Sequence, residues 1–104
     1  MHLKELIAIA KEIRESNNAL TKGEGNTPWG TPEHMQGFMG DVGDLAKLVM
    51  AKSGYRTYDD LDKKLAHELS DCLWSVMIIA DELGVDLEQA FLHTMEELRR
   101  RKAD

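Results

Sequence analysis

Two pairs of carboxylic acids are the residues of this chain whose type and spacing best suit chemistry. Asp41 and Asp44 form one pair, and Glu68 and Asp71 form the other. Residues three positions apart on a helix project from one face, about a turn apart. The 23 residues between the pairs, 45 to 67, are enough to end one helix, turn and begin an antiparallel one. We therefore expect a helical bundle to bring the two pairs together.

Four acids in one place repel each other strongly unless a cation neutralises them. Ligand sets made only of oxygen favour magnesium, manganese or calcium over zinc or copper. The sequence lacks both the calcium-binding loop of alternating acids and the Glu-x-x-His pairs of a di-iron bundle. We expect a Mg²⁺ site, with Mn²⁺ as the alternative ion. Mg²⁺ held by few carboxylates keeps positions open for water and phosphate oxygens, which suits phosphoanhydride cleavage.

The composition predicts one soluble domain, residues 1–104. The net charge of −6 argues against a nucleic-acid polymer as a partner. No apolar run approaches the roughly 20 residues of a membrane span, and the residues after Met1 are typical of a helix start and not of a signal peptide. One cysteine fits a reducing compartment. We therefore expect a cytoplasmic protein that binds neither a membrane nor a nucleic-acid polymer.

Apolar residues recur at steps of three and four in four stretches, which predicts four helices and an all-α fold. Thr31 is the expected N-cap of the second helix, with Pro32 at its first position. Gly84 ends the third helix, and Asp86 caps the fourth. Joined by short or moderate loops, these helices make a four-helix bundle. The predicted helices cover residues 2–20, 31–52, 61–83 and the chain from 86 onward.

The third predicted helix is apolar on more than one side. Its expected core stripe passes close to Glu68 and Asp71, and Trp74, Met77 and Ile78 extend the apolar surface to another face. A helix apolar nearly all round is buried on more than one side. In so short a chain we expect the second side to face another subunit of a homo-oligomer, a dimer or a tetramer. The residues of the stripe are Leu65, Leu69, Cys72, Val76, Ile79 and Leu83.

Two connections carry aromatic residues for which two interpretations stay open. Trp29 lies in a polar, glycine-rich loop, residues 21 to 31, and either folds back onto the core or offers a flat surface on which a nucleobase stacks. Tyr55, Arg56 and Tyr58 lie in the connection before the third helix, and either line a pocket or cover the end of the bundle. All four histidines are assigned to surface or satisfied core positions.

Three segments together resemble a known family. Gly-Asp-Val-Gly-Asp-Leu begins at residue 40, His-Glu-Leu-Ser-Asp-Cys-Leu-Trp at 67, and Gly-Val-Asp-Leu-Glu-Gln-Ala-Phe at 84. In this order they resemble the MazG-type all-α nucleoside triphosphate pyrophosphohydrolases, over residues 29 to 101. The family motif is a Glu-x-x-Glu pair followed, after a spacer, by a Glu-x-x-Asp pair. Glu68 and Asp71 match the second pair, whereas Asp41 and Asp44 stand where the first pair has Glu. Many members have a further Glu directly before the first pair. In this sequence Gly40 stands at that position, which resembles the dCTP pyrophosphatase-like branch of the family.

The resemblance implies Mg²⁺-dependent hydrolysis of a (deoxy)nucleoside triphosphate to the monophosphate and pyrophosphate. It implies that Trp29 stacks on the base. The family often places Lys and Asn on the last helix to grip the substrate, but Thr94 and Leu98 stand near those positions here, which leaves Arg101 as the best cation. The residues that carry over as metal ligands and catalytic acids are Asp41, Asp44, Glu68 and Asp71.

A second class of function remains open at this point. In it, the chain is a catalytically weak or inactive helical module that forms oligomers or binds nucleotides. One acid pair at this spacing is common in helices and is weak evidence for a site. Two pairs on adjacent helices, each beside an apolar stripe, favour the enzyme.

Overall fold

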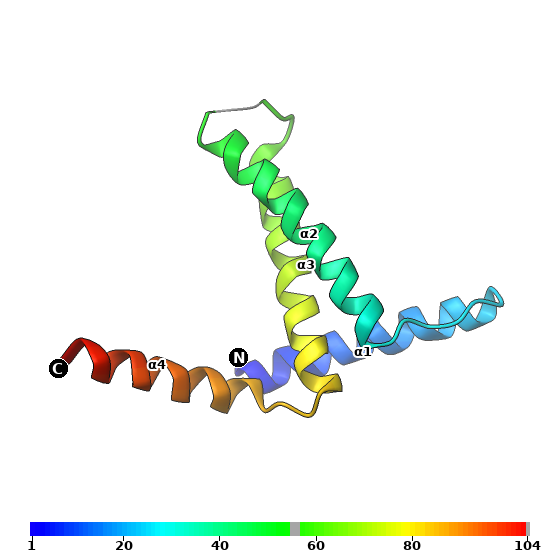
Figure 1. Cartoon of the computed structure of the whole chain (residues 1–104). Coiled ribbons are helices and arrows are strands. Elements are labelled where there is room, and N and C mark those ends of the chain that lie inside the picture. Colours follow the sequence, from blue (N-terminus) through cyan, green and yellow to red (C-terminus); the bar gives the residue numbers. More distant parts are fainter. Residues whose placement is uncertain (55–56, 104) are drawn as a thin grey trace.

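The computed structural model describes residues 1–54 and 57–103 of the chain, and within them it contains helices and no strands. Figure 1 shows these helices in chain order. The predicted all-α fold is therefore confirmed. Tyr55 and Arg56 lie outside the described residues, so the expectation for their connection stays a prediction. The helices are α1 (Leu3–Gly23), α2 (Thr31–Lys52), α3 (Leu61–Glu82) and α4 (Leu87–Ala103).

The helix ends follow local signals, with two differences from the prediction. Helix α1 continues to Gly23, so residues 21–23 are helical and not part of the predicted loop. Gly30, not Thr31, is the N-cap of α2, and the Gly30 backbone N–H donates to Glu33 Oε1 at 2.9 Å. The prediction that Thr31 caps this helix is wrong by one residue, because its hydroxyl donates to Glu82 instead, at 3.2 Å. Asp86 does cap α4, accepting from the backbone N–H of Gln89 at 3.2 Å.

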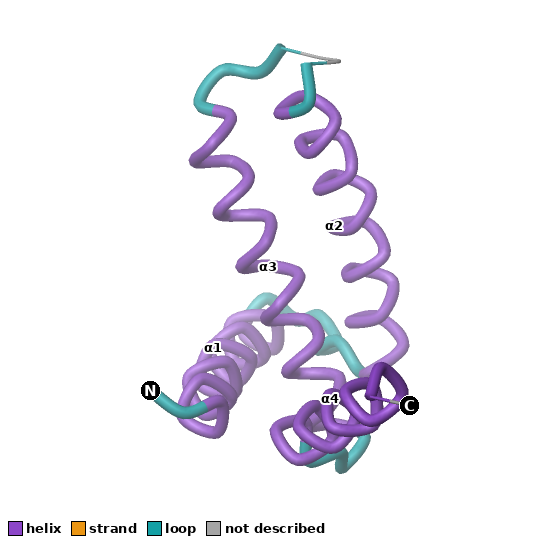
Figure 2. The backbone as a smooth tube through the Cα atoms, turned by 90° about the vertical axis from the view of Figure 1, so that its left-hand side faces the viewer, coloured by secondary structure: helices purple, strands orange, loops and turns teal. Residues whose placement is uncertain are grey.

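The helices form an antiparallel hairpin with two arms. Helices α2 and α3 run side by side, α1 crosses the lower end of α3, and α4 leads away from that end (Figures 1 and 2). The radius of gyration is 16.7 Å, whereas a compact domain of about 100 residues has a radius near 13 Å. The described helices of one chain therefore do not close into a compact four-helix bundle.

The best-buried part of the chain is the crossing of α1 and α3. Ile78 is 0% exposed and forms a cluster with Met77 and Ala10. The Trp74 indole N–H donates to the carbonyl oxygen of Ala10 at 3.1 Å. The prediction that Trp74, Met77 and Ile78 face a second subunit is therefore wrong, because α1 of the same chain covers them.

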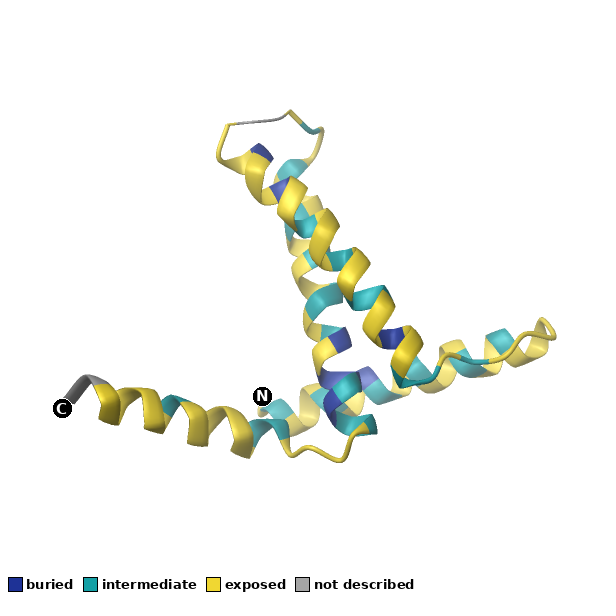
Figure 3. Cartoon of the chain, viewed as in Figure 1, coloured by how far each residue is buried: buried dark blue, intermediate teal, exposed yellow. Residues whose placement is uncertain are grey.

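Much of the predicted core stripe of α3 is exposed. Leu69 is 55% exposed and Leu83 is 63% exposed, and Leu73 beside the stripe is also exposed. Figure 3 shows this pattern over the whole chain, with buried positions confined to the helix crossing and a few places along the hairpin. Among the described residues, no helix is long and apolar enough to cross a membrane.

Candidate metal and nucleotide site

The hairpin brings three of the four predicted acids together. Asp41 and Asp44 on α2 and Glu68 on α3 each offer one carboxylate oxygen, and these oxygens all lie within 4.8 Å of one another. We call these three residues the acid trio. Asp71, one turn after Glu68, is not part of the trio. Its Oδ2 lies 3.2 Å from Nε2 of His67 on the same helix, and Asp71 lines the same cavity as Asp41.

Glu68 is the electrostatic focus of the trio. Its Oε1 is buried and has no hydrogen-bond partner among the described residues. Burial, the closeness of the Asp41 side chain and the negative charges of Asp41, Asp71 and Asp44 all raise the pKa of the Glu68 carboxyl. A buried polar atom without a partner is unfavourable by about 1–3 kcal/mol. The trio is therefore incomplete without a positive partner.

The same negative field reaches the only cysteine of the sequence. Burial, followed by the charges of Asp41, Glu68 and Asp71, raises the pKa of the Cys72 thiol. A thiol with a raised pKa is mostly protonated near neutral pH and is a weak nucleophile. Cys72 is therefore a packing residue beside the acids and not a nucleophile of the site.

The donor set of the trio fits a hard divalent cation. All three candidate ligands are carboxylates, and oxygen ligands are the ones that Mg²⁺ and Mn²⁺ prefer. The unpartnered oxygen of Glu68 is the atom that a cation would satisfy. Asp41, Asp44 and Glu68 would hold such an ion directly, and Asp71 lies one helical turn further along α3.

An aromatic cavity of about 490 Å³ adjoins the acids. Trp29, His34 and Trp74 form one part of its wall, and Asp41 and Asp71 form another. The Trp29 side chain is 55% exposed, so it does not fold back into a core, and the interpretation of Trp29 as a core plug is wrong. The cavity gives a flat, apolar ligand room beside the carboxylates.

Three rings are arranged edge to face in this cavity. The His34 ring centroid lies 5.8 Å from that of Trp29 and 5.7 Å from that of Trp74, with interplanar angles of 65° and 77°. Gly37 lets Trp29 approach α2 closely, because a Cβ atom at this position would lie 2.8 Å from Trp29 Cζ3. The position of the Trp29 ring therefore depends on the absence of a side chain at residue 37.

His34 is only 4% exposed, which confirms its assignment to a satisfied core position, but its place in the wall of the aromatic cavity was not predicted from the sequence. Its Nδ1 lies 2.9 Å from Glu82 Oε1, and Glu82 Oε2 lies 3.6 Å from Arg14 Nη1. The same Arg14 nitrogen donates to Asp81 at 3.0 Å. This ionic network joins α1, α2 and α3 behind the aromatic rings. One signal was available: His34 stands seven residues before Asp41, so two helical turns place both on one face of α2.

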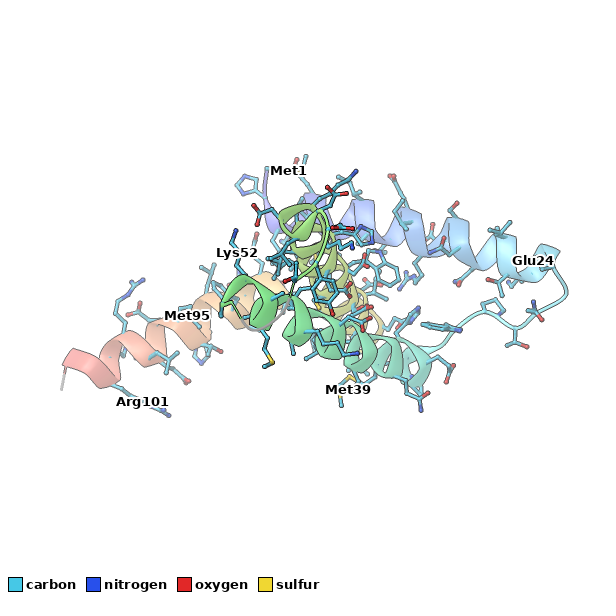
Figure 4. All side chains as sticks on the ribbon, turned by 90° about the horizontal axis from the view of Figure 1, so that it is seen from above. Met1, Glu24, Met39, Lys52, Met95 and Arg101 are labelled. Carbon is cyan, nitrogen blue, oxygen red and sulfur yellow. The ribbon has the colours of Figure 1, made fainter. Side chains whose placement is uncertain are left out.

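The structure places Arg101 far from the acids of its own chain. Figure 4 shows Arg101 near the outer end of α4, well away from Met39, which is two residues before Asp41. Its side chain is exposed. Within one chain, the structure therefore does not bring this cation to the trio, and its predicted role would require α4 of another copy.

Comparison with known proteins identifies one family. The sequence model of the MazG nucleotide pyrophosphohydrolase domain matches residues 3–104, which include the acid trio, the aromatic cavity and the ionic network. No curated protein and no solved structure matches the chain.

Proposed function

Because the chain belongs to the MazG nucleotide pyrophosphohydrolase family, we propose that it hydrolyses a nucleoside triphosphate to the monophosphate and pyrophosphate, with Mg²⁺ as its metal. The observation that carries this proposal is the joining of the aromatic cavity to the acid trio. The cavity volume of about 490 Å³ lies in the usual range for small-molecule sites. A nucleoside fits beside the rings while its α-phosphate lies at the carboxylates.

Each part of the site has a task in this reaction. Trp29 stacks on the base, and the edges of His34 and Trp74 bound the base on the other side. A divalent cation held by the acid trio would neutralise charge on the phosphate oxygens. Asp71 lines the cavity outside the trio and orients the attacking water. The water oxygen bonds to the α-phosphorus while Asp71 accepts a proton from the water and passes it to the solvent. The bond from that phosphorus to the bridging oxygen breaks, which releases pyrophosphate.

The product that receives ¹⁸O from labelled water shows which phosphoanhydride bond is cleaved. The protein is incubated with a panel of ribo- and deoxyribonucleoside triphosphates and MgCl₂ in ¹⁸O-labelled water, and products are analysed by mass spectrometry. We expect ¹⁸O in the monophosphate, none in pyrophosphate, and no turnover in EDTA. Label in pyrophosphate, or release of orthophosphate, would contradict attack at the α-phosphorus. Nucleotide binding without turnover would favour the alternative, an inactive binding module.

The exposed apolar surface supports assembly with a second copy of the chain, as a dimer or tetramer. The accessible surface is 7789 Å², about 1,900 Å² more than a compact monomer of this size exposes. A typical stable interface removes about 800 Å² from each partner. The exposed apolar residues of α3, of its C-cap and of α4 are the proposed contact: Leu69, Leu73, Leu83, Phe91 and Leu92.

Light scattering tests this assembly. Leu73→Glu should reduce the mass to that of one chain, because it introduces a charge on the apolar surface. An unchanged mass would contradict this interface.

The single cysteine also supports a reducing, cytoplasmic setting for the enzyme.

A further inference from the structure

A second cavity, of about 280 Å³, lies next to the acid trio and has a different wall. Asp44 and Glu68 border it, as members of the trio, and three basic side chains complete much of the lining: Lys47, Lys64 and His67. The aromatic cavity shares none of these five residues. We call this second space the cationic cleft.

The helix register places the cationic cleft beyond the acids, on the side away from the aromatic rings. Along α2, Gly37 and then Asp41 line the aromatic cavity, and Asp44 and then Lys47 line the cleft. Steps of three or four residues keep all four on one face of the helix. With a rise of about 1.5 Å per residue, Lys47 lies only about one turn past Asp44.

The antiparallel helix repeats this order in reverse. Trp74 and Asp71 line the aromatic cavity, and Glu68 and Lys64 line the cleft. Both helices therefore present rings, acids and cations in the same spatial sequence. A linear ligand along this face would meet an apolar surface first, then the carboxylates, and then two ammonium groups.

Both lysines are available to a ligand. Among the described residues, neither Lys47 nor Lys64 forms an ion pair, whereas Lys52 Nζ contacts Asp62 Oδ1 at 2.6 Å. Lys64 Nζ lies 5.6 Å from the centroid of the Tyr58 ring, a cation–π contact that holds the ammonium group in place. Two ammonium groups beside three carboxylates are suited to an anion that also carries a metal ion.

We infer that the cationic cleft binds the β- and γ-phosphates of the substrate and, after cleavage, the pyrophosphate product. This inference rests on the proposed function and adds a direction to it: the base lies at Trp29, the α-phosphate at the acid trio, and the diphosphate end between Lys47 and Lys64. The two lysines then supply the phosphate contacts that Arg101 does not reach within one chain.

Calorimetric titration with magnesium pyrophosphate tests the cleft directly. The full chain is compared with Lys47→Met, Lys64→Met and the double variant. Lys63→Met is the matched control, because this exposed neighbour lines none of the cavities described. Each cleft variant should weaken pyrophosphate binding about fivefold, with a larger loss in the double variant. The control should bind as the unchanged protein does.

A second measurement separates the phosphate chain from the nucleoside. The double variant should raise KM for the triphosphate and leave the affinity for the nucleoside monophosphate unchanged. Equal pyrophosphate affinity in the double variant and in Lys63→Met would overturn the inference, even if hydrolysis occurs. Lysine-dependent pyrophosphate binding without turnover of any nucleotide would support the cleft and contradict the proposed function instead.

Discussion

The same helix hairpin carries two groups of charges, and they are built in opposite ways. In the ionic network, Glu82 accepts from the Thr31 hydroxyl, contacts the His34 ring and faces Arg14. In the acid trio, carboxylates crowd together, and the buried Oε1 of Glu68 has no partner among the described residues.

The difference between the two groups separates a structural role from a functional one. The network supplies its own counter-charge and joins three helices, so it should stabilise the fold. The trio concentrates like charge, which destabilises the fold until a cation binds. A charge cluster left incomplete by its own chain is the one that points to a ligand.

The largest effect should come from the trio. Glu68→Gln should lower turnover at least about a hundredfold, because it removes one charged ligand. Its melting temperature in EDTA should stay the same or rise, since the substitution relieves repulsion. Pyrophosphate release and thermal unfolding measure the two effects. Full activity in this variant would show that Glu68 is not a required metal ligand. It would also contradict the functional role that distinguishes the acid trio from the ionic network.

The network should respond in the opposite way. Glu82→Gln should lower the free energy of unfolding by about 2 kcal/mol, because Arg14 and His34 lose a charged partner. Stabilisation by added Mg²⁺ should persist, since the trio is intact. Urea unfolding with and without the metal is the measurement. Loss of the metal response would show that the two groups act as one site.

Substitution of an aromatic ring should have a smaller effect than substitution in either charge group. Trp29→Ala should raise KM about tenfold, in the range expected for the loss of one base-stacking aromatic ring. Stability should change by less than about 1 kcal/mol, because the side chain is half exposed. Steady-state kinetics and a thermal melt separate these effects. A large stability loss with an unchanged KM would assign Trp29 to packing.

The smallest effect is a dependence of stability on pH. The pKa of Glu68 is raised in the folded chain above its ordinary value of 4.5, so the folded state binds the proton more tightly. This stabilising contribution is complete below 4.5 and is lost as the pH rises through the raised pKa. In EDTA, unfolding midpoints should therefore fall with rising pH more steeply in the unchanged protein than in Glu68→Gln. Parallel profiles would contradict the shift.

Local patterns in the sequence predicted the helices well. Helical periodicity, Asp86 as a cap and Gly84 as a terminator depend on residues close along the chain. The spacing of the acid pairs also predicted that two helices would bring Asp41 and Glu68 together. The turn of Asp71 toward His67 was not predictable, because it depends on a choice of side-chain rotamer within one helix.

The contacts of α3 were not predictable from its pattern. Leu69 and Ile78 are both apolar and lie on different sides of the helix, so periodicity alone does not say which side meets α1. The structure buries Ile78 and leaves Leu69 exposed. The partner of His34 was not predictable for a related reason, because Glu82 stands 48 residues away and no local signal joins the two.

The shape of the aromatic cavity beside Trp29 depends on the absence of a side chain at Gly37. A glycine inside a helix is less stable than alanine by about 0.5–1 kcal/mol, yet the carbon that alanine would add is the one that collides with the indole. Gly37→Ala would therefore strengthen α2 locally while displacing Trp29. Under the proposed function, residue 37 is the position at which base selectivity could be altered without changing any carboxylate.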